Sequence, residues 1–205
     1  MNQTANVTSE MHHSDEIGAK LGMWLFLFTE LLLFGGMFIL YAIYRASHSH
    51  EFFLAASELD TFIGTINTLA LLTSSLTVAL SIEALRRGNR KLSITMLIVT
   101  ILLGIIFMIN KYFEWSAKIH HGIYPGGEVL LRMSDGEMLF FNLYYVMTGL
   151  HGLHVLVGIV VLSAMLLFIT RGNQSSAIKL ENSGLYWHLV DIIWIFLFPL
   201  FYLIS

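Results

Sequence analysis

The chain has 205 residues, of which 56% are hydrophobic and only 12% are charged. Soluble domains carry about 25% charged residues, so this composition argues against a soluble globular protein, and its hydrophobicity excludes a disordered chain. Cysteine is absent, which excludes disulfides and thiolate-bound zinc, copper or iron–sulfur centres. The formal net charge of -3 is too small and too evenly spread to indicate nucleic-acid binding.

Five apolar stretches reach the length of about 20 residues that a helix needs to cross the core of a bilayer. These stretches cover approximately residues 22–44, 62–85, 92–112, 139–170 and 184–204. We expect helices because lipid leaves each segment to satisfy its own backbone polar groups. The sequence therefore predicts an all-α, polytopic membrane protein. Its predicted organisation is a polar N-terminal tail at residues 1–21 and a single five-helix membrane bundle at residues 22–205.

Lysine and arginine predict the orientation, because short cytoplasmic loops are enriched in them. Seven basic residues fall on one side of the predicted membrane: Lys20, Arg86, Arg87, Arg90, Lys91, Arg171 and Lys179. Four fall on the other side: Arg45, Lys111, Lys118 and Arg132. This bias predicts a cytoplasmic N-terminus and a C-terminus outside.

Two local features refine the helix ends. The string from Ser134 to Glu137, ahead of an apolar run, predicts a helix N-cap. Aromatic residues near the predicted ends are expected to anchor the helices at the membrane surface. This set consists of Trp24, Trp115, Tyr124, Tyr186 and Trp187.

Five ionisable residues fall inside the predicted spans: Glu30, His151, His154, His188 and Asp191. Each costs at least about 2.5–3.5 kcal/mol at membrane depth, so each needs a partner or a task. At a rise of 1.5 Å per residue, Glu30 and His154 lie at depths of about 21 and 22 Å from the outer ends of their helices. We therefore expect Glu30 to reach His154 or His151 and to lock the first helix onto the fourth.

Two interpretations of these residues compete. His151 and His154 are three residues apart, as are His188 and Asp191, so each pair shares one helix face. Imidazoles and carboxylates on facing helices can hold metals, but a di-metal bundle usually takes two Glu-x-x-His pairs and two further glutamates. Neither pair has that form, so we favour a buried hydrogen-bonded network over a catalytic or metal site. A proton relay through Glu30 would need a polar route across the bilayer, and the sequence shows no chain of ionisable groups that would provide one.

Other polar residues are expected to serve packing. The second predicted helix carries small hydroxyl residues that allow close helix contacts, among them Ser74 and Thr77. At the end of the third helix, Glu114 beside Lys111 and Lys118 predicts an interfacial ion pair.

Several strings occur together in a distinctive order: residues 20–24, 29–34, 67–77, 111–115, 134–136, 148–155 and 186–196. The most specific are Thr-Gly-Leu-His-Gly-Leu-His-Val at 148–155 and Tyr-Trp-His-Leu-Val-Asp at 186–191. Their order and spacing resemble subunit III of the haem–copper oxidases, the cytochrome c and quinol oxidases of aerobic respiratory chains. The resemblance covers nearly the whole chain after residue 19.

The resemblance implies a component of an oxidoreductase complex that is not catalytic by itself. Haem and copper are expected in partner subunits, and none is expected to bind to this chain. The implied partners are subunit I as the main contact, subunit II, a small subunit IV and structural phospholipids. The implied role is to support proton uptake and the lifetime of an oxygen-reducing, proton-translocating enzyme in the bacterial cytoplasmic membrane.

Long members of this family have seven helices, and this chain resembles the short bacterial form that lacks the first two. The lipid-filled cleft of the long form lies between those two helices and the other five, so another chain must complete any such cleft here. Two alternatives stay open: a subunit of a related nitric-oxide-reducing complex, and a stand-alone membrane metalloenzyme that uses the histidine pairs.

Overall fold

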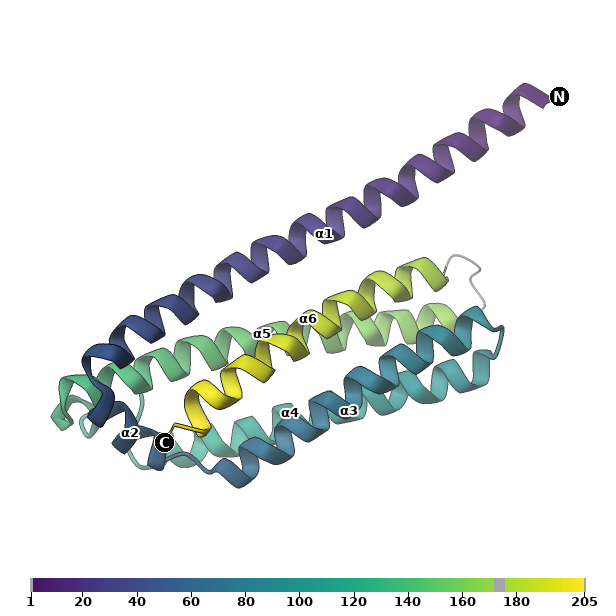
Figure 1. The fold of residues 1–205 in the computed structure, drawn as a ribbon. Coiled ribbons are helices and arrows are strands. Elements are labelled where there is room, and N and C mark those ends of the chain that lie inside the picture. The colour runs from purple at the N-terminus through teal and green to yellow at the C-terminus, as the bar shows by residue number, and fades with distance from the viewer. Residues whose placement is uncertain (1, 172–175, 205) are drawn as a thin grey trace. The chain divides into compact units, whose positions relative to one another are not determined.

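The computed structural model describes residues 2–171 and 176–204. Its elements are α1 (Asn2–Ser47), α2 (Ser49–Ser57), α3 (Thr61–Arg86), α4 (Arg90–His120), the short 3-10 helix η1 (Leu130–Arg132), α5 (Asp135–Thr170) and α6 (Ser176–Tyr202) (Figure 1). No strand occurs in these two described ranges. Five segments are long and apolar enough to cross a membrane: Lys20–Ser47, Thr61–Arg86, Arg90–His120, Asp135–Thr170 and Ile178–Tyr202. The prediction of an all-α protein with five spanning helices is therefore confirmed, whereas the side on which each terminus lies stays a prediction.

The helices are longer than their apolar cores. α4 continues to His120, α6 begins at Ser176, and α1 begins at Asn2, so the expected polar tail is helical from its second residue. Hydropathy marks only the part of a helix that suits lipid, whereas the helix itself ends where its backbone hydrogen bonds end. The nine-residue helix α2 was not predicted, because it is far too short to be recognised as a span.

The chain consists of two compact units, Met1–Gly36 and Met37–Ser205. The first unit is the N-terminal part of α1. In the second unit, α3 packs against α4 and α6, and α5 packs against the same two helices. Consecutive helices of this group run antiparallel (Figure 1), so α3 to α6 form an up-and-down four-helix bundle. The short helix α2 packs against α5 and α6.

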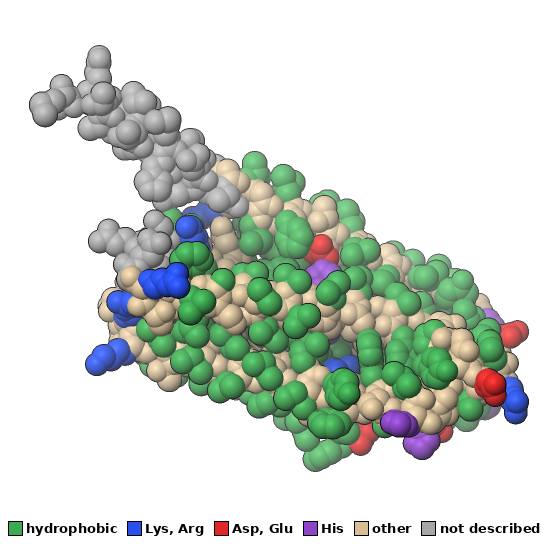
Figure 2. Space-filling model, turned by 180° about the vertical axis from the view of Figure 1, so that it is seen from behind, with side chains coloured by type: hydrophobic (Ala, Val, Ile, Leu, Met, Phe, Trp, Pro, Cys, Tyr) green, Lys and Arg blue, Asp and Glu red, His purple; other side chains and the backbone are tan. Residues whose placement is uncertain are grey.

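The surface of the protein suits a bilayer. Large hydrophobic side chains are exposed on the spanning helices, for example Leu76, Leu102 and Val160. Figure 2 shows hydrophobic side chains covering the face between the two ends, with most of the visible Lys and Arg side chains gathered at one end. Exposed apolar surface of this kind would cause a soluble protein to aggregate, but it is the expected surface in lipid.

Hydroxyl groups join α3 to its neighbours, as the sequence predicts. Thr77 and Thr100 share a hydrogen bond of 2.8 Å between their hydroxyls. The Ser81 hydroxyl donates to the Ser93 carbonyl of α4 at 2.9 Å. Small side chains allow these helix backbones to approach closely, and the hydroxyls satisfy one another where water is absent.

Trp187 lies at the centre of the bundle and is fully buried. Its indole N–H donates to the Ser74 hydroxyl of α3 at 3.0 Å. A Cβ atom at Gly104 of α4 would lie 2.8 Å from its ring, and a Cβ atom at Gly158 of α5 would lie 2.7 Å from it. The expectation that Trp187 anchors a helix end is therefore wrong: α6 begins at Ser176, which places Trp187 about three turns inside the helix.

The predicted N-cap of α5 is confirmed. The Ser134 hydroxyl accepts from the backbone N–H of Glu137, and the Glu137 carboxylate accepts from the backbone N–H of Ser134 at 3.0 Å. This capping box satisfies two of the amide groups that a helix start leaves without partners.

We predict that Gly158→Ala lowers the free energy of unfolding by about 1–3 kcal/mol, because the new methyl group would overlap the rigid Trp187 ring. Thermal unfolding in detergent would measure the change. Gly152→Ala is the matched control on the same helix, because nothing lies within 4 Å of a Cβ atom built there. Equal losses in the two variants would contradict the packing assignment.

Candidate functional site

A cluster of four polar side chains lies inside the bundle, formed by Lys111 and Glu114 of α4, Tyr144 of α5 and Tyr202 of α6. The Lys111 ammonium donates to Glu114 Oε2 at 3.2 Å, to the Tyr144 hydroxyl at 3.0 Å and to the Tyr202 hydroxyl at 2.8 Å. Both tyrosine hydroxyls donate to Glu114 Oε1, that of Tyr202 at 2.5 Å. Lys111 is only 6% exposed and Glu114 only 7%.

The cluster is closed and electrically neutral. An ammonium has three donors, and all three of them are used. The same ammonium lies 4.9 Å from the centre of the Tyr144 ring and 5.3 Å from that of Trp194, where the negative ring faces attract a cation. The arrangement meets the condition under which a buried ion pair is tolerated, namely that its remaining hydrogen-bonding capacity is satisfied.

The ion pair between Lys111 and Glu114 was expected, but its burial between helices was not. Lys118 does not join it, because its ammonium donates to the backbone carbonyl of Glu58 at 2.9 Å. Sequence reasoning also missed Tyr144 and Tyr202. Both look like ordinary aromatic residues of apolar helices, and only the packing of α5 and α6 on α4 brings them to Glu114.

His151 is fully buried in an aromatic environment next to this cluster. Its ring stacks on Trp194, with 5.2 Å between centroids and 28° between planes, and meets Phe107 edge-on at 5.6 Å. Neither ring nitrogen has a hydrogen-bond partner among the described residues. His151 therefore packs here as an aromatic ring of the core.

His154 has different surroundings, although it lies only three residues further along α5. Its Nδ1 lies 2.7 Å from the Leu150 carbonyl one turn earlier. Its own backbone carbonyl accepts from the Tyr186 hydroxyl at 3.0 Å. The two histidines of this predicted pair thus have separate sets of contacts.

His188 and Asp191 lie three residues apart on α6 but differ in their contacts. His188 Nδ1 and the Ser75 hydroxyl lie 2.6 Å apart. Asp191 is 2% exposed, and neither of its carboxyl oxygens has a hydrogen-bond partner among the described residues. The bond between His188 and Ser75 joins α6 to α3 and has the character of a packing contact between two helices.

Glu30 belongs to the first unit, Met1–Gly36, and is half-buried. The bond that we expect from Glu30 to His154 or His151 stays a prediction. Within residues 2–171 and 176–204, no three His, Asp or Glu side chains gather closely enough to hold a metal ion. His151, His154 and His188 therefore have separate surroundings and do not converge on one site.

We predict that Lys111→Met destabilises the protein by about 3–5 kcal/mol, because it leaves the Glu114 carboxylate buried without its cation. Lys111→Met combined with Glu114→Gln should recover part of this loss, which thermal unfolding in detergent would measure. The exposed pair of Arg87 and Glu83, 2.7 Å apart, provides the control, because Glu83→Gln should cost less than about 1 kcal/mol. A Lys111→Met loss no larger than that of the control would show that the cluster does not hold the helices together.

Comparison with known proteins gives a consistent result over the full length. The family model described as cytochrome c oxidase subunit III matches residues 1–205. A probable quinol oxidase subunit 3 of Staphylococcus saprophyticus is 31% identical over 100% of this chain and 98% of its own length. A cytochrome c oxidase subunit 3 of Thermostichus vulcanus is 31% identical over 90% of this chain and 87% of its own.

A third relative has a different organisation. It is the haem–copper oxidase subunit I+III of Aeropyrum pernix, which is 30% identical over 90% of this chain and 22% of its own length. The resemblance inferred from the sequence strings is therefore confirmed, and the chain belongs to the cytochrome c oxidase subunit III family.

Proposed function

We propose that this chain, as subunit III of a haem–copper terminal oxidase, acts without a redox centre of its own. It packs against subunit I in the bacterial cytoplasmic membrane, holds phospholipids, and supports proton uptake and the lifetime of the enzyme. Electrons pass to oxygen in the partner subunits, where haem and copper are bound. Subunit II and a small subunit IV complete the proposed complex.

The contacts of the buried polar groups support a role without redox chemistry. Lys111 and Glu114 bond to each other and to two tyrosines, His151 packs between aromatic rings, and His188 bonds to Ser75. These groups are engaged in contacts between helices, which is the packing role that the proposal assigns to them.

The relative from Aeropyrum pernix supports contact with subunit I. Its name, subunit I+III, describes two subunits in one chain, and this chain matches 22% of that length. Two subunits that are joined covalently in one protein are expected to be neighbours where they are separate. The fusion is the observation that carries the proposed contact.

Affinity purification through a tag on this chain, after mild detergent extraction, tests the proposal. We expect haem absorbance and copper to co-purify with subunits I and II, and the complex to reduce oxygen. Comparing reduced cytochrome c with a quinol as electron donor would then identify the type of oxidase. An unrelated tagged membrane protein from the same cells serves as the control. A purified lone chain that keeps stoichiometric iron, copper or zinc and turns over a substrate would overturn the proposal.

Glu30→Ala tests the proposed role of the buried carboxyl group. We expect the variant to lose phospholipid and to dissociate more readily from subunit I, because an intramembrane carboxyl is retained for a partner or a task. The haem spectrum of assembled complex should stay nearly unchanged, and Glu30→Gln, which keeps a hydrogen-bonding side chain, should lie between. Loss of the haem signal from properly assembled complex would contradict this role.

A further inference from the structure

Arg45 is a half-buried arginine in the last turn of α1. It lies two residues before the end of the apolar span Lys20–Ser47, which is the depth at which lipid headgroups begin. The guanidinium has five N–H donors. None of them forms an ion pair or hydrogen bond with a residue that the structure describes.

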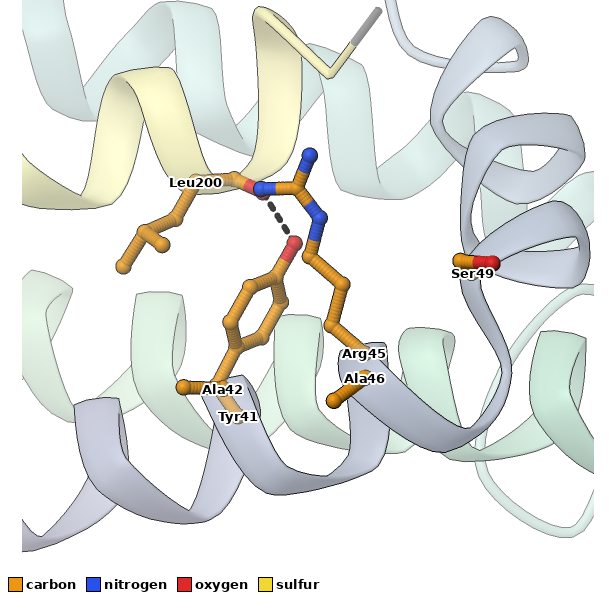
Figure 3. Close-up of a pocket in the computed structure, with 6 residues that line it drawn as sticks. All are labelled: Tyr41, Ala42, Arg45, Ala46, Ser49 and Leu200. Atoms are coloured by element: carbon orange, nitrogen blue, oxygen red, sulfur yellow. Dashed lines mark hydrogen bonds between the residues drawn. The ribbon is translucent and has the colours of Figure 1, made fainter.

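A cleft of about 330 Å³ lies beside this arginine, lined by Tyr41, Ala42, Arg45, Ala46, Ser49 and Leu200. Figure 3 shows Arg45 and the Tyr41 ring extending side by side from α1 toward α6. The Tyr41 hydroxyl donates to the Leu200 carbonyl. That bond fixes one wall of the cleft.

Glu51 and Asp60, two acidic residues that follow Arg45 in the sequence, have their carboxylates directed toward other groups. A Cβ atom built on Gly136 would meet the Glu51 carboxylate, so Glu51 faces the start of α5. The Asp60 carboxylate accepts from the backbone N–H groups of Phe62 and Ile63 as the cap of α3. Arg45 thus keeps its positive charge unpaired, and the chain supplies no carboxylate that neutralises it within the described residues.

The remaining walls of the cleft also suit an anion. Ser49 is the first residue of α2, and the N-cap residue His48 makes no side-chain hydrogen bond to the amides of the first turn. The start of a helix favours negative charge, and Ser49 brings the start of α2 to the cleft. Ala42, Ala46 and Leu200 provide an apolar side on which the glycerol and the first acyl carbons can lie.

We propose that this cleft binds the phosphate group of a phospholipid, with Arg45 as its charged ligand. The planar guanidinium presents paired donors that match two phosphate oxygens. This assignment names a residue and a headgroup chemistry for the phospholipid binding proposed above. It rests on that proposal only for the membrane setting, and it needs neither Glu30 nor contact with subunit I.

Native mass spectrometry of the detergent-solubilised complex, titrated with phosphatidylglycerol, tests the proposal. We expect R45Q to weaken one lipid adduct by about tenfold or more, the range for losing hydrogen bonds to a charged group. R45K should lie between wild type and R45Q, because an ammonium keeps the charge but loses the paired donors. R132Q is the matched control: Arg132 is an exposed arginine of η1, which packs against α5 as α2 does, and its loss should leave the adduct unchanged.

Soluble anions separate the two possible sources of phosphate. Glycerol 3-phosphate and inorganic phosphate should not displace the lipid, because they lack the acyl chains that contribute to its binding. Displacement at equal concentration would overturn the lipid assignment, and equal lipid binding by R45Q and wild type would overturn the site. A lipid adduct seen on the isolated chain but absent from the intact complex would also overturn it, since a neighbouring subunit would then cover Arg45. If no complex with subunit I forms, lipid binding by wild type, R45Q and R45K can still be compared on the purified chain. Failure of the oxidase proposal is therefore distinguishable from failure of the lipid site.

Discussion

A polar group surrounded by lipid has to find its partner within the protein, and this constraint determines how the helices of the bundle meet. Hydrophobic packing alone cannot set their register, because lipid tails are as apolar as leucine side chains. The cluster around Lys111 can set it, since α4 supplies both charges while α5 and α6 each supply one hydroxyl. A shift of α6 by one turn, about 5.4 Å, would remove the Tyr202 hydroxyl and leave donors and acceptors unsatisfied.

The same constraint acts along the length of α6. The Trp187 indole donates to Ser74 and the Trp194 indole donates to Thr68, both at 3.0 Å and both on α3. Each large ring brings one polar N–H into the bundle, and α3 provides a small hydroxyl opposite it. The polar residues of α3 are therefore packing partners of α6, and the two helices fit in one register because two separate bonds have to form together.

Local signals in the sequence predict the spans and the cap of α5, because hydropathy and a capping box depend only on neighbouring residues. The polar cluster is not local: Tyr144 and Tyr202 lie 30 and 88 residues from Glu114. No spacing rule within one helix reveals that a tyrosine of another helix will meet a carboxylate. Trp187 was misplaced for a related reason, because polar residues that continue a helix beyond the lipid hide where α6 begins. His151 and His154 are spaced to share a helix face, yet they contact different neighbours. Residues three positions apart are displaced along the helix and around it, so they can meet different side chains of the adjacent helices.

Satisfied and unsatisfied polar groups are distributed unevenly, and this bears on how a member of the subunit III family can contribute to a larger complex. Inside the bundle, Lys111 and Glu114 complete each other, so the fold of the second unit does not require a charged partner from outside. At the membrane surface, Arg45 has no such partner among the described residues and faces a cleft with an apolar side. The paired charges of Lys111 and Glu114 suit the bundle to lipid, and the proposed binding of a lipid phosphate would use Arg45, a cation that the described residues leave without an ion pair.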